Sequence, residues 1–191
     1  MLEKVSPNQL TVLRMAFVPL LVLLIVYQHN GLALIVFVTA GLTDMLDGLI
    51  ARKYGRKTHL GSFLDPLADK LLLVSAFTIL SFSSLDLTVR VPLWLTITVI
   101  SRDVLLVLSV LLINLTIGRR AFPPSILGKC TTVFQLVLVM VVLLSNHLRA
   151  ELPGIEVLTY LTLALTVTSG IHYMLQGMRL MGIEVEDDGQ L

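Results

Sequence analysis

Four aspartates lie close together in an otherwise apolar part of the sequence. Asp44 and Asp47 are three residues apart, and Asp65 and Asp69 are four apart. Residues at these spacings share one face of an α-helix, so each pair should present its two carboxylates together. Like charges this close in a partly dehydrated place repel one another, and either protonation or a bound cation relieves the repulsion. Carboxylate oxygens without nearby histidine or cysteine ligands favour a hard ion, Mg²⁺ or Mn²⁺.

Small and basic residues accompany the first aspartate pair. Gly48 directly follows Asp47 and leaves space for a ligand or a neighbouring backbone, as does Ala51. Arg52 lies eight residues after Asp44 and offers a planar fork for phosphate oxygens. The alternative is that the aspartates merely cap helix ends and face water. That alternative suits one aspartate better than four at matched helical spacing, so we predict a site for metal and phosphate.

The composition indicates the kind of element that carries these residues. The chain has 191 residues, of which 55% are hydrophobic and 14% are charged, whereas soluble proteins are about 25% charged. This composition predicts an integral membrane protein. The formal net charge of +1 and the 6% aromatic content give no basic surface for nucleic acid. The single cysteine, Cys130, excludes an internal disulfide.

Apolar runs of spanning length predict an all-α protein with six transmembrane helices in one domain over residues 1–191. We place the helices at about 10–28, 31–52, 67–85, 91–115, 125–146 and 155–178. Of the 14 lysines and arginines, eleven lie at one end of these helices and two at the other. Because cytoplasmic connectors carry the basic excess, we expect both termini and the aspartates on the cytoplasmic side of the inner membrane.

The motif as a whole resembles the signature of a known family. The pattern Asp44-x-x-Asp47-Gly48-x-x-Ala51-Arg52, then eight residues, then Gly61-x-x-x-Asp65-x-x-x-Asp69, is similar to that of the CDP-alcohol phosphatidyltransferases at every motif position. Residues 8–14, 63–70 and 128–129 are similar to the bacterial phosphatidylglycerophosphate synthases and to the cardiolipin synthases that use CDP-diacylglycerol. The resemblance implies a fold of six transmembrane helices, commonly assembled as a homodimer within membrane lipids.

The resemblance also implies the chemistry. Family members transfer a phosphatidyl group from CDP-diacylglycerol to an alcohol and release CMP, with two divalent ions, Mg²⁺ or Mn²⁺. By resemblance, one ion is held by Asp44, Asp47 and Asp65, while Asp69 completes the second metal site and acts as the base. The residues that it implies for CDP-diacylglycerol binding are Asp44, Gly48, Ala51, Arg52 and Gly61.

The acceptor requires a further site. Arg102 lies about ten residues inside an otherwise apolar run, where an arginine is costly enough to suggest a role. If it converges with Lys129, the two cations form a pocket for an acceptor phosphate such as that of sn-glycerol 3-phosphate. Alternatively, Arg102 holds helices together by pairing with Asp103 or with the aspartates. Because adjacent helical residues point apart, we expect direct pairing with Asp103 to be poor.

Three functions therefore stay open from the sequence. The first is phosphatidylglycerophosphate synthesis with glycerol 3-phosphate as acceptor, and the second is cardiolipin synthesis with phosphatidylglycerol as acceptor. Residues 101–106 and 131–135 are somewhat closer to the cardiolipin synthases, and an inositol phosphate acceptor is less expected. The third is a cation-coupled transporter, which requires carboxylates near the membrane midplane, whereas these aspartates lie beside basic connectors.

Overall fold

The computed structural model of the chain describes the backbone of residues 7–54, 61–116 and 126–180, and the side chains of residues 15–43, 70–109 and 126–176. These ranges contain helices and no strand, which confirms the all-helical prediction. The six helices are α1 (Pro7–Val26), α2 (Asn30–Tyr54), α3 (Gly61–Leu80), α4 (Leu93–Thr116), α5 (Ile126–Leu148) and α6 (Ile155–Leu180).

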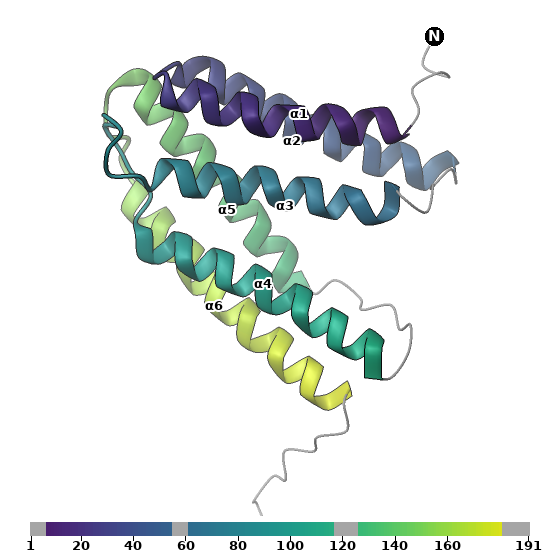
Figure 1. Cartoon of the computed structure of the whole chain (residues 1–191). Helices are drawn as coiled ribbons and strands as arrows, with labels where there is room; N and C mark the ends of the chain where they lie inside the picture. The colour runs from purple at the N-terminus through teal and green to yellow at the C-terminus, as the bar shows by residue number, and fades with distance from the viewer. Residues whose placement is uncertain (1–6, 55–60, 117–125, 181–191) are drawn as a thin grey trace, which may run out of the picture.

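Successive helices run in opposite directions (Figure 1). Helices α1, α2 and α3 form one group, in which α1 packs against both α2 and α3, and α4 packs against α6 in a second group. Helix α5 contacts α2, α3 and α6 and so joins the two groups. This alternation places the C-terminal end of α2 and the N-terminal end of α3 at the same end of the molecule.

Helix α5 carries the periodicity expected of a central element. Its buried residues recur every three or four positions, and they are Gly128, Thr131, Gln135, Leu138, Val139, Val142, Leu143, Ser145 and Asn146. The largest fully buried side chains around it include Phe37 of α2 and Phe77 of α3. The core therefore forms where the first three helices meet α5.

Two described segments, Ile126–Leu148 and Ile155–Gln176, are long and apolar enough to cross a membrane, judged by length and composition. Many large apolar side chains on other helices are also exposed. They include Leu32, Ile35, Leu71, Leu93, Ile97, Val104, Leu105 and Leu108.

The connector between α3 and α4 is fixed to α5 by one buried amide. The Val89 N–H donates to Asn146 Oδ1 (3.0 Å), and Asn146 Nδ2 donates to the carbonyl oxygens of Val89 and Val142 (2.8 Å each). The side chain thus pairs with the Val89 backbone in the way a neighbouring strand would. Nearby, a Cβ on Gly31 would lie 2.7 Å from the His147 ring, so the start of α2 approaches α5 closely, and a larger residue there would displace the His147 side chain.

The largest boundary difference from the sequence prediction concerns the third helix, which was expected over residues 67–85. It begins at Gly61 and ends at Leu80, so Asp65 lies inside the helix, one turn before Asp69. The Ser81 N–H donates to the Phe77 carbonyl, and the Val91 N–H donates to the Leu80 carbonyl. The apolar residues after Leu80 therefore belong to a connector, which buries Leu87 and Val89 in the core.

Candidate active site

The four aspartates of the motif occupy two helices. Asp44 and Asp47 lie in the second half of α2, and Asp65 and Asp69 lie in the first half of α3. Because both segments are helical, the spacings of three and four residues place each pair on one helix face. The two segments lie at the same end of the molecule (Figure 1).

The side chains of these aspartates lie outside the described residues, as do those of the predicted CDP-diacylglycerol ligands in α2, namely Gly48, Ala51 and Arg52. Gly61 is the first residue of α3. Convergence of the four carboxylates therefore stays a prediction. The side chains that the structure does describe contain no group of three or more His, Cys, Asp or Glu residues able to hold a metal ion.

Beginning one residue after Asp69 in the sequence, a largely buried charged cluster joins three helices. We call Lys70, Arg102, Asp103 and Ser169 the charge cluster. Asp103 Oδ1 lies 2.9 Å from Lys70 Nζ of α3 and 2.7 Å from Arg102 Nη1. Arg102 Nη2 donates to Ser169 Oγ of α6 at 2.7 Å. Because Lys70 directly follows Asp69, the cluster begins one residue after the predicted base.

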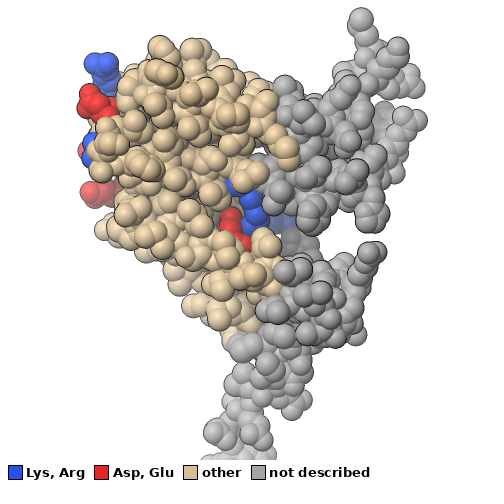
Figure 2. Space-filling view, viewed as in Figure 1, with Lys and Arg blue, Asp and Glu red and all other residues tan. Residues whose placement is uncertain are grey.

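Figure 2 shows the surface near this region. Charged atoms of both signs lie together in a hollow near the middle of the visible face, surrounded by uncharged residues and by atoms drawn in grey. Other charged atoms in this view lie along one edge of the molecule. The described connectors carry exposed charged residues at the end away from the aspartates, namely Asp86, Arg90, Arg149 and Glu151, with Glu156 at the start of α6.

Arg102 is 7% exposed, and several groups surround it. Its guanidinium carbon lies 5.5 Å from the centroid of the Tyr173 ring, a distance at which a cation is attracted to an aromatic face. The expectation that Arg102 and Asp103 would pair poorly was wrong. The backbone points the two side chains apart, but the arginine side chain is long enough to bring Nη1 back to its neighbour's carboxylate.

Lys129, the second cation predicted for the acceptor, lies in the first turn of α5 and is exposed. The described contacts of Arg102 are with Asp103, Ser169 and Tyr173, and Lys129 is not among them. The convergence of Arg102 with Lys129 stays a prediction. The lysine that the structure does connect to Arg102, through Asp103, is Lys70.

Sequence reasoning missed Lys70 as a partner, although the sequence contained a signal. Lys70 and Asp103 each lie in apolar helices, and ionisable residues in such helices usually pair with one another. Ser169 and Tyr173 carried a weaker signal, because they are four residues apart on α6 and so share one face. That face meets Arg102 only in the folded chain.

Helices α5 and α6 approach closely beside the charge cluster. The Thr131 hydroxyl donates to the Leu165 carbonyl at 3.1 Å, and Gln135 Nε2 lies 3.4 Å from Thr166 Oγ1. All but Leu165 among these residues are buried. Such contacts between small polar side chains are typical of helices packed in a membrane, and they fix the part of α6 that presents Ser169.

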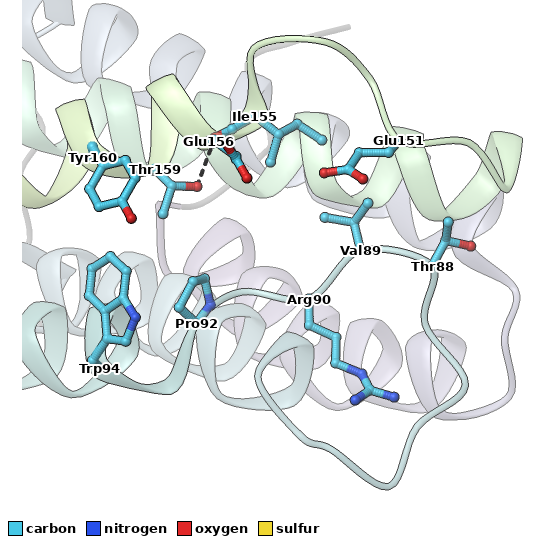
Figure 3. Close-up of a pocket in the computed structure, with 10 residues that line it drawn as sticks. All are labelled: Thr88, Val89, Arg90, Pro92, Trp94, Glu151, Ile155, Glu156, Thr159 and Tyr160. Atoms are coloured by element: carbon cyan, nitrogen blue, oxygen red, sulfur yellow. Dashed lines mark hydrogen bonds between the residues drawn. The ribbon is translucent and has the colours of Figure 1, made fainter.

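An open cavity of about 340 Å³ lies at the opposite end of the helices, between the start of α4 and the start of α6 (Figure 3). Trp94 and Tyr160 stack at its edge, with ring centroids 6.0 Å apart. The Thr159 hydroxyl donates to the Ile155 carbonyl at 2.8 Å. Glu151 and Glu156 line the same cavity. None of the predicted site residues lines it.

Comparison with known proteins identifies the family. Residues 4–171 match the family model described as CDP-alcohol phosphatidyltransferase. A protein of Mycobacterium tuberculosis named "Probable phosphatidylglycerophosphate synthase" is 36% identical over 182 residues, which cover 92% of this chain and 82% of that protein.

Two relatives carry a different name. The "Cardiolipin synthase (CMP-forming)" of Homo sapiens is 32% identical over 93% of this chain and 63% of its own length. The protein of the same name from Streptomyces coelicolor is 31% identical over 95% of this chain and 86% of its own length. The family match over residues 4–171 and the relatives named as phosphatidylglycerophosphate and cardiolipin synthases show that this chain is an enzyme of phospholipid biosynthesis and belongs to the CDP-alcohol phosphatidyltransferase family.

Proposed function

We propose that the chain transfers the phosphatidyl group of CDP-diacylglycerol to a hydroxyl of sn-glycerol 3-phosphate, giving phosphatidylglycerophosphate and CMP. The observation that carries this proposal is the aspartate motif, which lies on α2 and α3 at one end of the molecule within the matched family region. The relative named as a phosphatidylglycerophosphate synthase is 36% identical to this chain, slightly more than the 32% and 31% of the two cardiolipin synthases, and this difference supports the choice of acceptor.

The second candidate is cardiolipin synthesis with phosphatidylglycerol as acceptor. It is supported by the human and Streptomyces coelicolor relatives, whose identities of 32% and 31% are close to the 36% of the first relative. The cation-coupled transporter is set aside, because the family is one of transferases.

The donor set suits two divalent ions. The motif supplies four carboxylates and no imidazole or thiolate, a set that favours Mg²⁺ or Mn²⁺, and the helical backbone of α2 and α3 keeps each pair on one face. Asp44, Asp47 and Asp65 would hold one ion, and Asp69 would complete the second site. When bound, the ions would neutralise the pyrophosphate of the donor and stabilise the charge that develops during transfer.

Residues of the chain accept the proton of the acceptor and hold the cytidine diphosphate. The Asp69 carboxylate accepts the proton of the acceptor hydroxyl, whose oxygen forms a bond to the phosphorus that carries the diacylglycerol. The bond from that phosphorus to the CMP oxygen breaks, and CMP leaves with the electron pair. Around the cytidine diphosphate we place Gly48, Ala51, Arg52 and Gly61. Because phosphoryl transfer needs positioning and charge neutralisation more than covalent help, this set is sufficient.

The surface of the described helices supports placement in a membrane. The two apolar segments in α5 and α6 and the exposed apolar side chains of α2, α3 and α4 support six membrane-spanning helices, because lipid tails solvate such surfaces. An even number of spans puts both termini on one side, and the eleven-to-two distribution of basic residues supports the cytoplasm as the side that holds the termini and the aspartates. A homodimer is part of the same proposal by family resemblance.

The acceptor phosphate is assigned to Arg102, which is cationic, buried and joined to α3 through Asp103. A second cation is supplied either by Lys129, as the sequence predicted, or by Lys70, which shares the Asp103 carboxylate with Arg102.

A CMP-release assay tests this function. The purified full chain is reconstituted in nanodiscs with labelled CDP-diacylglycerol and Mg²⁺, and glycerol 3-phosphate, phosphatidylglycerol and inositol phosphate are offered in turn. CMP release that requires glycerol 3-phosphate supports the proposal, whereas release only with phosphatidylglycerol would establish the second candidate. No CMP release with any acceptor, or full activity after exhaustive chelation, would contradict metal-dependent phosphatidyl transfer.

A further inference from the structure

The open cavity at the end of the helices opposite the aspartates is lined by two carboxylates and one arginine. The carboxylates of Glu151 and Glu156 face the space between the start of α4 and the start of α6, whereas the Arg90 guanidinium points away from it (Figure 3). Arg90 instead donates to the Leu85 carbonyl at 2.9 Å. Neither glutamate forms an ion pair with any residue that the structure describes. The cavity therefore presents uncompensated negative charge.

An aromatic pair stands beside these carboxylates. Trp94 and Tyr160 stack with an angle of 23° between their rings, and the face of such a ring attracts a cation. The buried Thr159 hydroxyl, which donates to the Ile155 carbonyl, retains an oxygen that can accept a hydrogen bond. Tryptophan and tyrosine are common where helices leave a membrane, but that preference does not explain the carboxylates. Together these groups suit a ligand that is positively charged and carries N–H donors, which is a primary ammonium.

Two apolar stripes lead away from the aromatic pair along the helices. Exposed apolar side chains recur at helical spacing after Trp94 on α4 and after Tyr160 on α6, so each stripe shares a helix face with its aromatic residue. The two stripes begin side by side, because Trp94 and Tyr160 are stacked. Acyl chains can lie along such stripes, whereas an amine dissolved in water gains nothing from them. The members are Ile97, Leu105 and Leu108 on α4, and Val167, Ile171 and Met174 on α6.

We propose that this cavity binds the headgroup of a phospholipid that ends in a primary ammonium, such as phosphatidylethanolamine, in the membrane leaflet away from the aspartates. Glu151 and Glu156 accept its N–H groups, the aromatic pair faces its positive charge, and the two stripes hold its acyl chains. A choline headgroup has the charge but no N–H donor, and a glycerol headgroup has no positive charge, so both should bind more weakly. The proposal rests on the membrane placement proposed above and is independent of the acceptor.

The chain carries its own reporter for this site, because Trp94 is its only tryptophan. Bromine quenches tryptophan fluorescence at short range, so the full chain is placed in nanodiscs that contain a lipid brominated near the carbonyl end of one acyl chain. Phosphatidylethanolamine, phosphatidylcholine and phosphatidylglycerol with identical brominated chains are compared over a range of mole fractions. Phosphatidylethanolamine should quench Trp94 with an apparent affinity about three- to tenfold higher than the other two, as expected for one cation–π contact and exposed ion pairs.

Substitution of both glutamates should remove this preference. The double variant Glu151→Gln with Glu156→Gln keeps the shape of the side chains and removes their charge, so the three lipids should quench equally. Asp86→Asn is the matched control, because Asp86 is an exposed carboxylate at the same end that does not line the cavity, and it should keep the preference. Tyr160→Leu removes the aromatic partner without removing the reporter and should reduce the preference. Circular dichroism and thermal unfolding establish that each variant is folded.

Several results would overturn the proposal. Equal quenching by the three lipids, a preference for phosphatidylglycerol, or a preference that survives in the double variant would each contradict it, as would an equal loss in Asp86→Asn. Ethanolamine in the buffer lacks acyl chains and should not reverse the quenching at millimolar concentration, whereas full reversal would assign the cavity to a soluble amine. No quenching by any brominated lipid would contradict the membrane placement as well. CMP release is measured in the same nanodiscs, so a preference for phosphatidylethanolamine without CMP release would contradict only the proposed reaction.

Discussion

Arg90 and Arg102 show that two regions of the molecule surround the same residue type differently. Arg90 is exposed in the α3–α4 connector, and its Nη2 donates to the Leu85 carbonyl at 2.9 Å. Arg102 is buried in α4, where a carboxylate, a hydroxyl and an aromatic ring surround it. Water can satisfy the remaining donors of Arg90, whereas those of Arg102 depend on the protein or on a ligand. Burial, rather than charge itself, distinguishes the arginine for which we propose a role in acceptor binding.

The same contrast applies to the carboxylates. Glu151 and Glu156 are exposed beside the open cavity at the far end (Figure 3), and exposed charges contribute little to stability. Asp103 is 8% exposed and lies against two cations. Changes at the aspartate end should therefore affect the reaction, and equivalent changes at the far end should not.

The largest expected effect is the loss of activity at the aspartate end. Asp65→Asn and Asp69→Asn should each abolish CMP release without unfolding the chain, because removing a charge from a repulsive cluster does not by itself destabilise the fold. Glu156→Gln, at the far end, should retain activity. CMP release and thermal unfolding in detergent check both statements. A folded Asp69→Asn variant with near-normal turnover would exclude Asp69 as the base.

The second prediction asks whether the two ends face opposite sides of the membrane. In a chain with Cys130 replaced by serine, Ala150→Cys should react with an impermeant thiol reagent added outside intact cells, and Thr58→Cys should not. Ala150 is the better reporter of the far end, because a side chain at Gly31 would meet the His147 ring at 2.7 Å. Labelling in the reverse pattern would place the aspartates on the wrong side for cytoplasmic CDP-diacylglycerol.

The third prediction compares the two arginines in catalysis. Charge-assisted hydrogen bonds contribute about 1.5–3 kcal/mol each, which corresponds to a change of roughly ten- to a hundredfold in binding. Arg102→Gln should raise the KM for glycerol 3-phosphate by that factor and leave the KM for CDP-diacylglycerol much less affected. Arg90→Gln should change neither. Equal acceptor kinetics in the two variants would remove the functional contrast between the ends.

The smallest expected effect concerns the stability of the far end. Asn146→Ala removes three hydrogen bonds and leaves the Val89 N–H and carbonyl without partners, so it should lower the free energy of unfolding by about 1–3 kcal/mol. Arg90→Ala, an exposed change, should stay within about 0.5 kcal/mol. Thermal unfolding in the same detergent measures both. Activity per folded molecule should be unchanged, and a loss of activity in the folded Asn146→Ala variant would show that the far end does influence the reaction.

Local features of the sequence determined the helices and the helix faces that carry the aspartate motif. Apolar runs predicted six helices, because a helix satisfies its backbone groups within one segment and needs no distant partner. The spacing of Asp44, Asp47, Asp65 and Asp69 fixed the two helix faces that carry the motif, since helical periodicity is local. The end of α3 was misplaced because apolar residues in the connector are buried by α5, and no short window contains that contact.

Only the tertiary structure decided the partners of the buried charges. Lys70, Arg102 and Ser169 are up to 99 residues apart in the chain, and the packing of α3, α4 and α6 brings them to one place. The sequence predicted that an arginine in an apolar helix needs a partner, but the identity of the partner depends on which helix faces meet. Periodicity assigns residues to faces, whereas helix packing selects the neighbours, and so Lys70 rather than Lys129 lies beside the carboxylate that holds Arg102.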